Sequence, residues 1–183
     1  YGTITDGIGF TRSLEEQGWL IKDKKITMVG AGGASTAIMV QLALDGVKEI
    51  IVYNRTMRTE FQEIINNTII ETGCTITLSD LESLKKDMHS SYLFINTTGV
   101  GMEPMLERSV VPDASYFKPD LKVADIIYQP AVTKMLRLAK EAGCATMNGE
   151  LMLLYQGVES FKIWTGQEMP INEVKKVLGI EVK

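Results

Sequence analysis

The glycines between Gly30 and Gly33 are the residues whose spacing most clearly suggests chemistry. They follow a short apolar run, Ile26–Val29, and precede a stretch suited to a helix, Ala34–Leu44. A strand, a glycine turn and a helix in this order point free backbone N–H groups, at the positive end of a helix dipole, toward a ligand above the strand. A pyrophosphate suits such a turn, because the first glycine permits the tight bend and the second lets the backbone approach the phosphates. Ser35 stands where a third glycine or alanine is usual, so the prediction depends on the strand and helix around the turn.

The residues after the next apolar run, Glu49–Tyr53, should contact the other end of such a ligand. An NAD-binding unit places a carboxylate about 20 residues beyond the turn, on the ribose hydroxyls. This chain has Asn54 there, followed by Arg55 and Arg58, and the nearest acid, Glu60, lies in the next predicted helix. A guanidinium can bond phosphate oxygens in pairs, which favours a 2′-phosphate and therefore NADP over NAD. The alternative is two solvated arginines in a loop.

A third polar stretch, Asn96–Met102 (NTTGVGM), follows the apolar run Tyr92–Ile95. Hydroxyls and glycines at the carboxyl end of a strand fit the crevice where parallel sheets bind ligands, although an ordinary turn has the same composition. Asp125 is predicted in the middle of a later strand, Val123–Ile127, where a buried carboxylate needs partners, and we interpret it as structural.

The single histidine and the two cysteines give no comparable evidence of a functional site. His89 is the only histidine and closes a polar stretch, so we expect it to be exposed and not catalytic. Cys74 and Cys144 have no paired spacing, and we expect two buried thiols in a reducing cytoplasm, with neither a disulfide nor a metal site.

Composition limits the class of protein. The chain has 183 residues, of which 45% are hydrophobic and 23% charged, which is typical of one globular domain with a sizeable core. A net charge of −4 without a long basic run argues against nucleic acid. No apolar run approaches the roughly 18 residues of a membrane span, and no signal peptide is visible. The chain starts at Tyr1 and not at methionine, so we expect that a preceding part is missing.

Apolar runs alternate with helical patterns along the chain, and the strands and helices that they predict would position these residues. The pattern predicts an α/β fold with a doubly wound parallel sheet, a Rossmann-like domain over residues 1–183. Asp6 would be the N-cap of the first helix, and residues 103–118 would form a surface loop. The expected strands are 26–29, 49–53, 75–78, 92–95, 123–127 and 144–147, and the expected helices 9–18, 34–44, 59–72, 81–88, 133–142, 150–165 and 172–178.

Six ordered motifs together resemble the shikimate dehydrogenase family across essentially the whole chain. They are Thr5-Asp6-Gly7, Val29–Ser35 (VGAGGAS), Asn54-Arg55-Thr56, Asn96–Met102 (NTTGVGM), Asp125–Thr133 (DIIYQPxxT) and Asn148–Gln156 (NGELMLLYQ). The segment LLYQGVESFKIWTG looks closer to the quinate/shikimate branch. The resemblance implies NADP-dependent, or else NAD-dependent, interconversion of shikimate and 3-dehydroshikimate in aromatic amino acid biosynthesis, with quinate and 3-dehydroquinate as a further pair. It also implies an N-terminal domain with a catalytic lysine, which is absent from this chain.

The resemblance assigns roles to single residues. Asp6 matches the aspartate that pairs with the missing lysine at the reacting hydroxyl, which suits the proton that alcohol oxidation must release. Gln156 matches a ligand of a substrate hydroxyl, and Tyr128 the substrate-side tyrosine. The implied cofactor-binding residues are Gly30, Ala31, Gly32, Gly33 and Ala34 at the pyrophosphate, Asn54, Arg55, Thr56 and Arg58 at the adenosine ribose, and Thr98, Gly99, Ile126, Gly149 and Met152 along the nicotinamide.

Two other functions fit parts of the pattern. A dinucleotide-sensing regulatory module could keep the fold without catalysis, but it would not need Asp6 and Gln156. An NADP enzyme of another substrate, such as a folate-type dehydrogenase, has a similar domain, and the NGELMLLYQ helix argues against it. We expect a cytoplasmic enzyme acting on a small molecule, without a metal, and a homodimer is one option for the complete protein.

Overall fold

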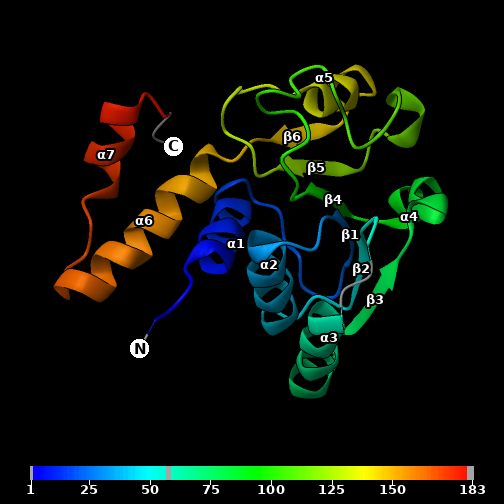
Figure 1. Ribbon diagram of the computed structural model, residues 1–183. Helices are drawn as coiled ribbons and strands as arrows, with labels where there is room; N and C mark the ends of the chain where they lie inside the picture. Colours follow the sequence, from blue (N-terminus) through cyan, green and yellow to red (C-terminus); the bar gives the residue numbers. More distant parts are fainter. Residues whose placement is uncertain (1, 57–58, 181–183) are drawn as a thin grey trace.

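The centre of the molecule is a parallel sheet with helices on both faces (Figure 1). The structure is a computed structural model that describes residues 2–56 and 59–180. Within these residues six strands lie in the order β3-β2-β1-β4-β5-β6. They are β1 (Lys25–Val29), β2 (Glu49–Tyr53), β3 (Thr75–Ser79), β4 (Leu93–Asn96), β5 (Lys122–Asp125) and β6 (Ala145–Met147). The order reverses between β1 and β4, where open sheets of this kind bind ligands. The predicted fold class is confirmed.

The helices cover the two faces with separate apolar clusters. They are α1 (Asp6–Glu16), α2 (Gly33–Leu44), α3 (Thr59–Thr72), α4 (Leu84–Ser90), α5 (Lys134–Glu141), α6 (Glu150–Thr165) and α7 (Ile171–Leu178), with short 3₁₀ turns η1 (Leu81–Ser83) and η2 (Ala114–Tyr116). Successive side chains of a strand point to opposite faces. Ile50 and Val52 therefore pack with α1, α2 and α3, whereas Ile51 and Tyr53 pack with α4 and α5. A sheet covered on both faces explains why its strands are almost continuously apolar.

Glycines let α1 lie very close to its two neighbours. A Cβ added at Gly7 would lie 2.4 Å from the carbonyl oxygen of Ala37 in α2, and one added at Gly9 would lie 2.6 Å from the backbone nitrogen of Gln156 in α6. The first helix begins at Asp6, earlier than predicted. Its N-cap is Thr5, so the prediction that Asp6 caps the helix is wrong, and Asp6 instead places a negative charge in the first turn, near the positive end of the dipole.

Several predicted boundaries also differ from the structure. Asp125 is the last residue of β5 and not its middle, because the strand ends two residues before the predicted end. The predicted helix over 81–88 divides into η1 and α4. Residues 103–118 are not only a surface loop, because they include η2, and Val111 and Phe117 are buried against the face that α4 and α5 cover. None of the helices in residues 2–56 and 59–180 has both the length and the hydropathy needed to cross a membrane.

Candidate functional site

The glycine turn lies between β1 and α2 and leaves open space above it. Gly30 has φ +117°, a conformation that favours glycine, and a Cβ there would lie 2.5 Å from Thr97 Oγ1. By contrast, a Cβ at Gly32 or Gly33 would meet nothing within 4 Å. Gly32 is the N-cap of α2, and neither a side-chain cap nor an acidic residue occupies its first turn. The turn therefore offers helix N-terminal N–H groups to a ligand, as an anion requires.

A side-chain hydrogen bond of Ser35 stabilises the glycine turn. The Ser35 side chain is fully buried, and its hydroxyl donates a hydrogen bond to the carbonyl of Gly30 at 2.6 Å. This contact holds the first helical turn close to the end of β1, so serine is compatible with the close packing that the pattern usually obtains from glycine or alanine. Ala31, within the turn, and Ala34, in the first turn of α2, are both half-buried small residues.

The loop after β4 lies directly beside the glycine turn. The Thr97 hydroxyl donates to the carbonyl of Val29, the last residue of β1, at 2.7 Å. Asn96, fully buried at the end of β4, accepts hydrogen bonds from both the backbone N–H and the hydroxyl of Thr98 through its Oδ1. The predicted ligand-binding stretch Asn96–Met102 therefore adjoins the predicted pyrophosphate turn at the switch point of the sheet.

Asp125 fixes the next loop, after β5. Its carboxylate is 1% exposed and accepts hydrogen bonds from the amide of Asn96, the backbone N–H of Ile127 and the hydroxyl of Thr133. Burial raises the pKa of Asp125 to about 6, although the three hydrogen bonds favour the ionised form and limit the rise. These three donors meet the predicted need of Asp125 for buried partners.

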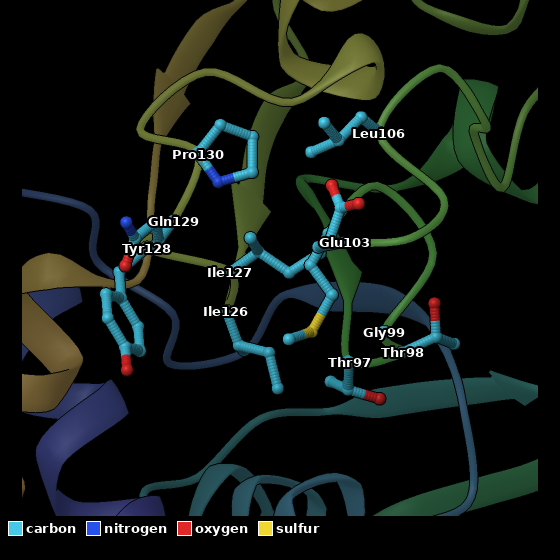
Figure 2. A pocket seen from close by; sticks show the side chains of 11 residues that line it. Thr97, Thr98, Gly99, Glu103, Leu106, Ile126, Ile127, Tyr128, Gln129 and Pro130 are labelled. Carbon is cyan, nitrogen blue, oxygen red and sulfur yellow. The ribbon is translucent and has the colours of Figure 1, made fainter.

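A pocket of about 590 Å³ opens between these two loops at the carboxyl ends of β4 and β5 (Figure 2). Its lining is mostly apolar. In Figure 2, Tyr128 lies on one side, and Glu103 and Leu106 lie on the other. The lining residues are Thr97, Thr98, Gly99, Met102, Glu103, Leu106, Ile126, Ile127, Tyr128, Gln129 and Pro130. A largely apolar pocket with a few polar groups is the usual form of a small-molecule site.

The pocket brings together only some of the predicted residues. Thr98, Gly99, Ile126 and Tyr128 line it, and the Tyr128 side chain is exposed. On the opposite wall, Met102 belongs to the predicted ligand-binding stretch, whereas Glu103 and Leu106 were predicted only as part of a surface loop. The apolar Leu106 within this polar loop is a signal that could have indicated its place in the wall.

Two predicted cofactor residues have a packing role in the structure. Gly149 is buried, and a Cβ there would lie 2.0 Å from the carbonyl oxygen of Ile126. This close approach places the start of α6 against the pocket wall. Met152 is 6% exposed and belongs to the apolar cluster that also contains Phe10 and Ile95.

The end of β2 places the residues predicted for the adenosine ribose. The Asn54 side-chain amide donates to the carbonyl of Thr56 at 2.5 Å, which shapes the loop. Arg55 and Thr56 are exposed, so the guanidinium is available to a ligand. Arg58 lies outside the described residues.

Asp6 and Gln156 come from two helices that touch. Gly9, one turn after Asp6, packs on the backbone of Gln156, and the Thr5 hydroxyl is hydrogen-bonded to that of Ser160 at 3.1 Å. Gln156 lies seven residues along α6 from Gly149, about 10 Å at the helical rise. Both side chains are half-buried. Asp6 and Gln156 thus lie on two neighbouring helices that pack directly against each other.

The remaining predicted side chains lie elsewhere. His89 is exposed, as predicted, and its ring is hydrogen-bonded to the Ser115 carbonyl. Cys74 and Cys144 are buried and free, and burial raises the pKa of both thiols. Among the described residues neither cysteine forms a disulfide.

Known proteins resemble this chain in both sequence and fold. The profile of the family described as Shikimate / quinate 5-dehydrogenase matches residues 13–140, and that of the Shikimate 5'-dehydrogenase C-terminal domain matches residues 149–178. The chain is 44% identical to a protein of Listeria innocua serovar 6a named Shikimate dehydrogenase (NADP(+)), covering 97% of this chain and 62% of that protein. The chain therefore spans less than two thirds of this relative.

Two solved structures show the same arrangement. The crystal structure of shikimate 5-dehydrogenase from Listeria monocytogenes, in complex with shikimate and NAD, superposes with a TM-score of 0.91 at 44% identity, over 97% of this chain and 63% of that one. Quinate dehydrogenase from Corynebacterium glutamicum in complex with NAD has a TM-score of 0.84 at 27% identity, over 97% of this chain and 62% of that one.

Proposed function

Because the chain belongs to the shikimate and quinate dehydrogenase family, we propose that it is the dinucleotide-binding part of an enzyme that interconverts shikimate and 3-dehydroshikimate. Quinate and 3-dehydroquinate form a second substrate pair. The relatives are longer than this chain. In our proposal the complete protein therefore has a further, N-terminal domain with the catalytic lysine that the family resemblance implies.

The open glycine turn beside the pocket is the observation that carries this proposal. Gly32 and Gly33 leave room above the uncapped N-terminus of α2, where a pyrophosphate would be held by backbone N–H groups. Thr97 links this turn to the pocket at the ends of β4 and β5. The nicotinamide would occupy that pocket, between the loops that contain Thr98 and Ile126.

The proposed cofactor is NADP. Arg55 is exposed beside the ribose position, and the preceding residue is the amide Asn54 and not a carboxylate. A guanidinium there favours a 2′-phosphate. The name of the Listeria innocua relative supports NADP. The Listeria monocytogenes structure contains NAD, so NAD is the alternative cofactor in our proposal.

The substrate-side residues have distinct proposed roles. A bound dinucleotide would supply the acceptor for the hydride that leaves the alcohol carbon of the substrate. Asp6, with the lysine of the missing domain, takes the proton that leaves the same hydroxyl. Gln156 hydrogen-bonds another substrate hydroxyl, and Tyr128 bounds the substrate side of the pocket. Because Gly9 lets α1 pack on the backbone of α6, Asp6 and Gln156 are held on two closely packed helices.

The reaction can be tested directly with the complete protein. We expect NADPH to form when shikimate and NADP⁺ are supplied, measured by absorbance. Asp6→Asn should lower turnover about 10²–10⁴-fold, the usual contribution of a positioned proton acceptor. Its melting temperature should change little, because no side-chain hydrogen bond or ion pair joins Asp6 to the described part of the chain.

The matched control is Glu15→Gln, an exposed acid on the same helix, which should leave turnover unchanged. A protein that binds NADP⁺ but forms no NADPH with either shikimate or quinate would contradict the enzyme and support a sensing module. Unchanged turnover in Asp6→Asn would remove the catalytic role of this residue.

A further inference from the structure

Two buried polar residues join the loops on both sides of the pocket. Asn96 and Asp125 are register partners at the carboxyl ends of β4 and β5, and they are 0% and 1% exposed. The Asn96 amide donates to Asp125 Oδ1 at 3.0 Å. A direct bond between buried polar side chains of adjacent strands fixes the relative position of the two strand ends.

From this central bond each residue holds its own loop. Asn96 Oδ1 accepts from the backbone N–H of Thr98 at 3.1 Å and from its hydroxyl at 2.7 Å, and the Asn96 amide also donates to the Val100 carbonyl. Asp125 accepts from the backbone N–H of Ile127 at 3.2 Å. Thr98 and Ile127 both line the pocket. The pair thus binds directly to both walls of the pocket without lining it.

Asp125 also anchors the pocket to the helix behind it. The Thr133 hydroxyl donates to Asp125 Oδ2 at 2.7 Å and accepts from the Leu136 N–H as the N-cap of α5. None of the three donors to the carboxylate carries a charge, so neutral hydrogen bonds, and not an ion pair, hold the Asp125 carboxylate in place. An amide at this position has a single acceptor oxygen with two lone pairs, so it cannot accept hydrogen bonds from all three donors as the carboxylate does.

We propose that Asn96 and Asp125 are positioning residues that hold the two pocket loops in the arrangement needed by the nicotinamide half of the cofactor. The inference rests on the proposed function, which places that half in the pocket. The adenosine half would lie further along the same carboxyl edge of the sheet, after β1 and β2, and does not depend on these two residues. Damage to the pair should therefore affect one half of the dinucleotide and leave the other.

A comparison of two probes tests this separation in the complete protein. NADP⁺ spans both halves, whereas adenosine 2′,5′-bisphosphate carries only the adenosine half. By calorimetric titration, Asp125→Asn should weaken NADP⁺ binding about tenfold or more, the scale of a buried polar contact left unpaired. Its affinity for adenosine 2′,5′-bisphosphate should stay within about twofold of the wild type, because the residues around the glycine turn are unchanged.

Two further variants keep the test decisive. Asp120→Asn removes an exposed charge just before β5 and should change neither affinity. Where Asp125→Asn does not fold, Thr133→Val takes its place, since it removes one donor to the carboxylate outside the pocket lining. Thr133→Ser keeps that donor and should bind NADP⁺ like the wild type.

The outcomes separate this inference from the proposed function. Equal weakening of both probes, or unchanged NADP⁺ affinity in a folded variant, would overturn the positioning role while the wild type still binds the cofactor. A wild-type protein that binds neither probe would overturn the proposed function and this inference with it.

Discussion

At the scale of single residues, side chains close to the ends of the strands decide which ligand the edge of the sheet can accept. Ser35 stabilises the glycine turn through the Gly30 carbonyl, and Thr97 joins that turn to the pocket. The exposed Arg55 follows β2 with Asn54 in place of an acid. The charge at this end is therefore suited to a phosphate and not to ribose hydroxyls alone.

Arg55 allows a test of the cofactor preference. Arg55→Ala in the complete protein should weaken NADP⁺ binding by roughly 1–3 kcal/mol, because a charge-assisted hydrogen bond to the 2′-phosphate is lost. NAD⁺ lacks this phosphate, so its affinity should hardly change. Calorimetric titration of both nucleotides measures the difference.

Arg108→Ala is the control for Arg55→Ala, since it removes an exposed arginine from a loop distant in sequence. It should leave both affinities unchanged. An equal loss for NADP⁺ and NAD⁺ in Arg55→Ala, or tighter binding of NAD⁺ by the wild type, would show that this arginine does not select the cofactor.

At the scale of elements, the missing Cβ atoms of Gly7 and Gly9 determine how closely α1 packs on its neighbours. Gly7 and Gly9 bring its backbone against α2 and α6, respectively, and an ion pair between Arg12 and Glu159 continues the contact with α6. The distance between α1 and α6 is therefore fixed by the absence of a Cβ at Gly9. Asp6 and Gln156, on these two helices, depend on this distance for their shared geometry.

Gly9→Ala tests the importance of the crossing. Its Cβ would lie 2.6 Å from the backbone of Gln156 and must push α1 away from α6. A displacement of about 1 Å can cost on the order of 10² in turnover. The complete variant should therefore turn over shikimate much more slowly while its NADP⁺ affinity stays near the wild-type value.

The control for Gly9→Ala is Gly157→Ala on α6, where an added Cβ meets no atom within 4 Å. Turnover and affinity should both be preserved there. Normal turnover in Gly9→Ala would show that the crossing does not position the substrate-side residues.

The sequence predicts elements better than it predicts the pocket. The strands appear at the predicted places because their apolar runs are long and bounded by glycines and polar residues. The contribution of Glu103 and Leu106 to the pocket was not predicted, since a loop that lacks periodic structure gives no signal of what it faces. The predicted start of α1, at residue 9, was three residues too late, and its cap is Thr5 and not Asp6, because the sequence Asp-Gly resembles a cap although Asp6 is already helical.

Buried polar contacts show the same limit at a finer level. A partner for Asp125 could be expected from burial alone, but the identity of Asn96 and Thr133 depends on register and on a loop that returns to the end of β5. Such pairs join residues far apart in sequence. Only the fold brings them together.

At the scale of the whole molecule, the proposed cofactor site follows the carboxyl edge of four adjacent strands. In the order β2-β1-β4-β5 this edge presents Arg55, the glycine turn, the Thr98 loop and the Ile126 loop. Beyond α1 lie α6 and α7, on one side of the sheet (Figure 1). The buried Lys175 of α7 pairs with Glu16 of α1 at 2.7 Å, so the last helix is tied to the first.

The central claim is that the glycine turn binds the dinucleotide. Gly32 has φ −96°, which any residue can adopt, and a Cβ there would meet no atom within 4 Å. Gly32→Val should therefore fold with an unchanged melting temperature, while its side chain fills the space that the pyrophosphate needs. Gly32→Ala should show a smaller effect of the same kind.

Calorimetric titration of the complete protein with NADP⁺ is the most direct test of this claim. The wild type should bind the nucleotide saturably, at one site, and folded Gly32→Val should give no measurable binding. Wild-type affinity in the folded Gly32→Val variant would contradict the claim, because a pyrophosphate could not then lie on this turn.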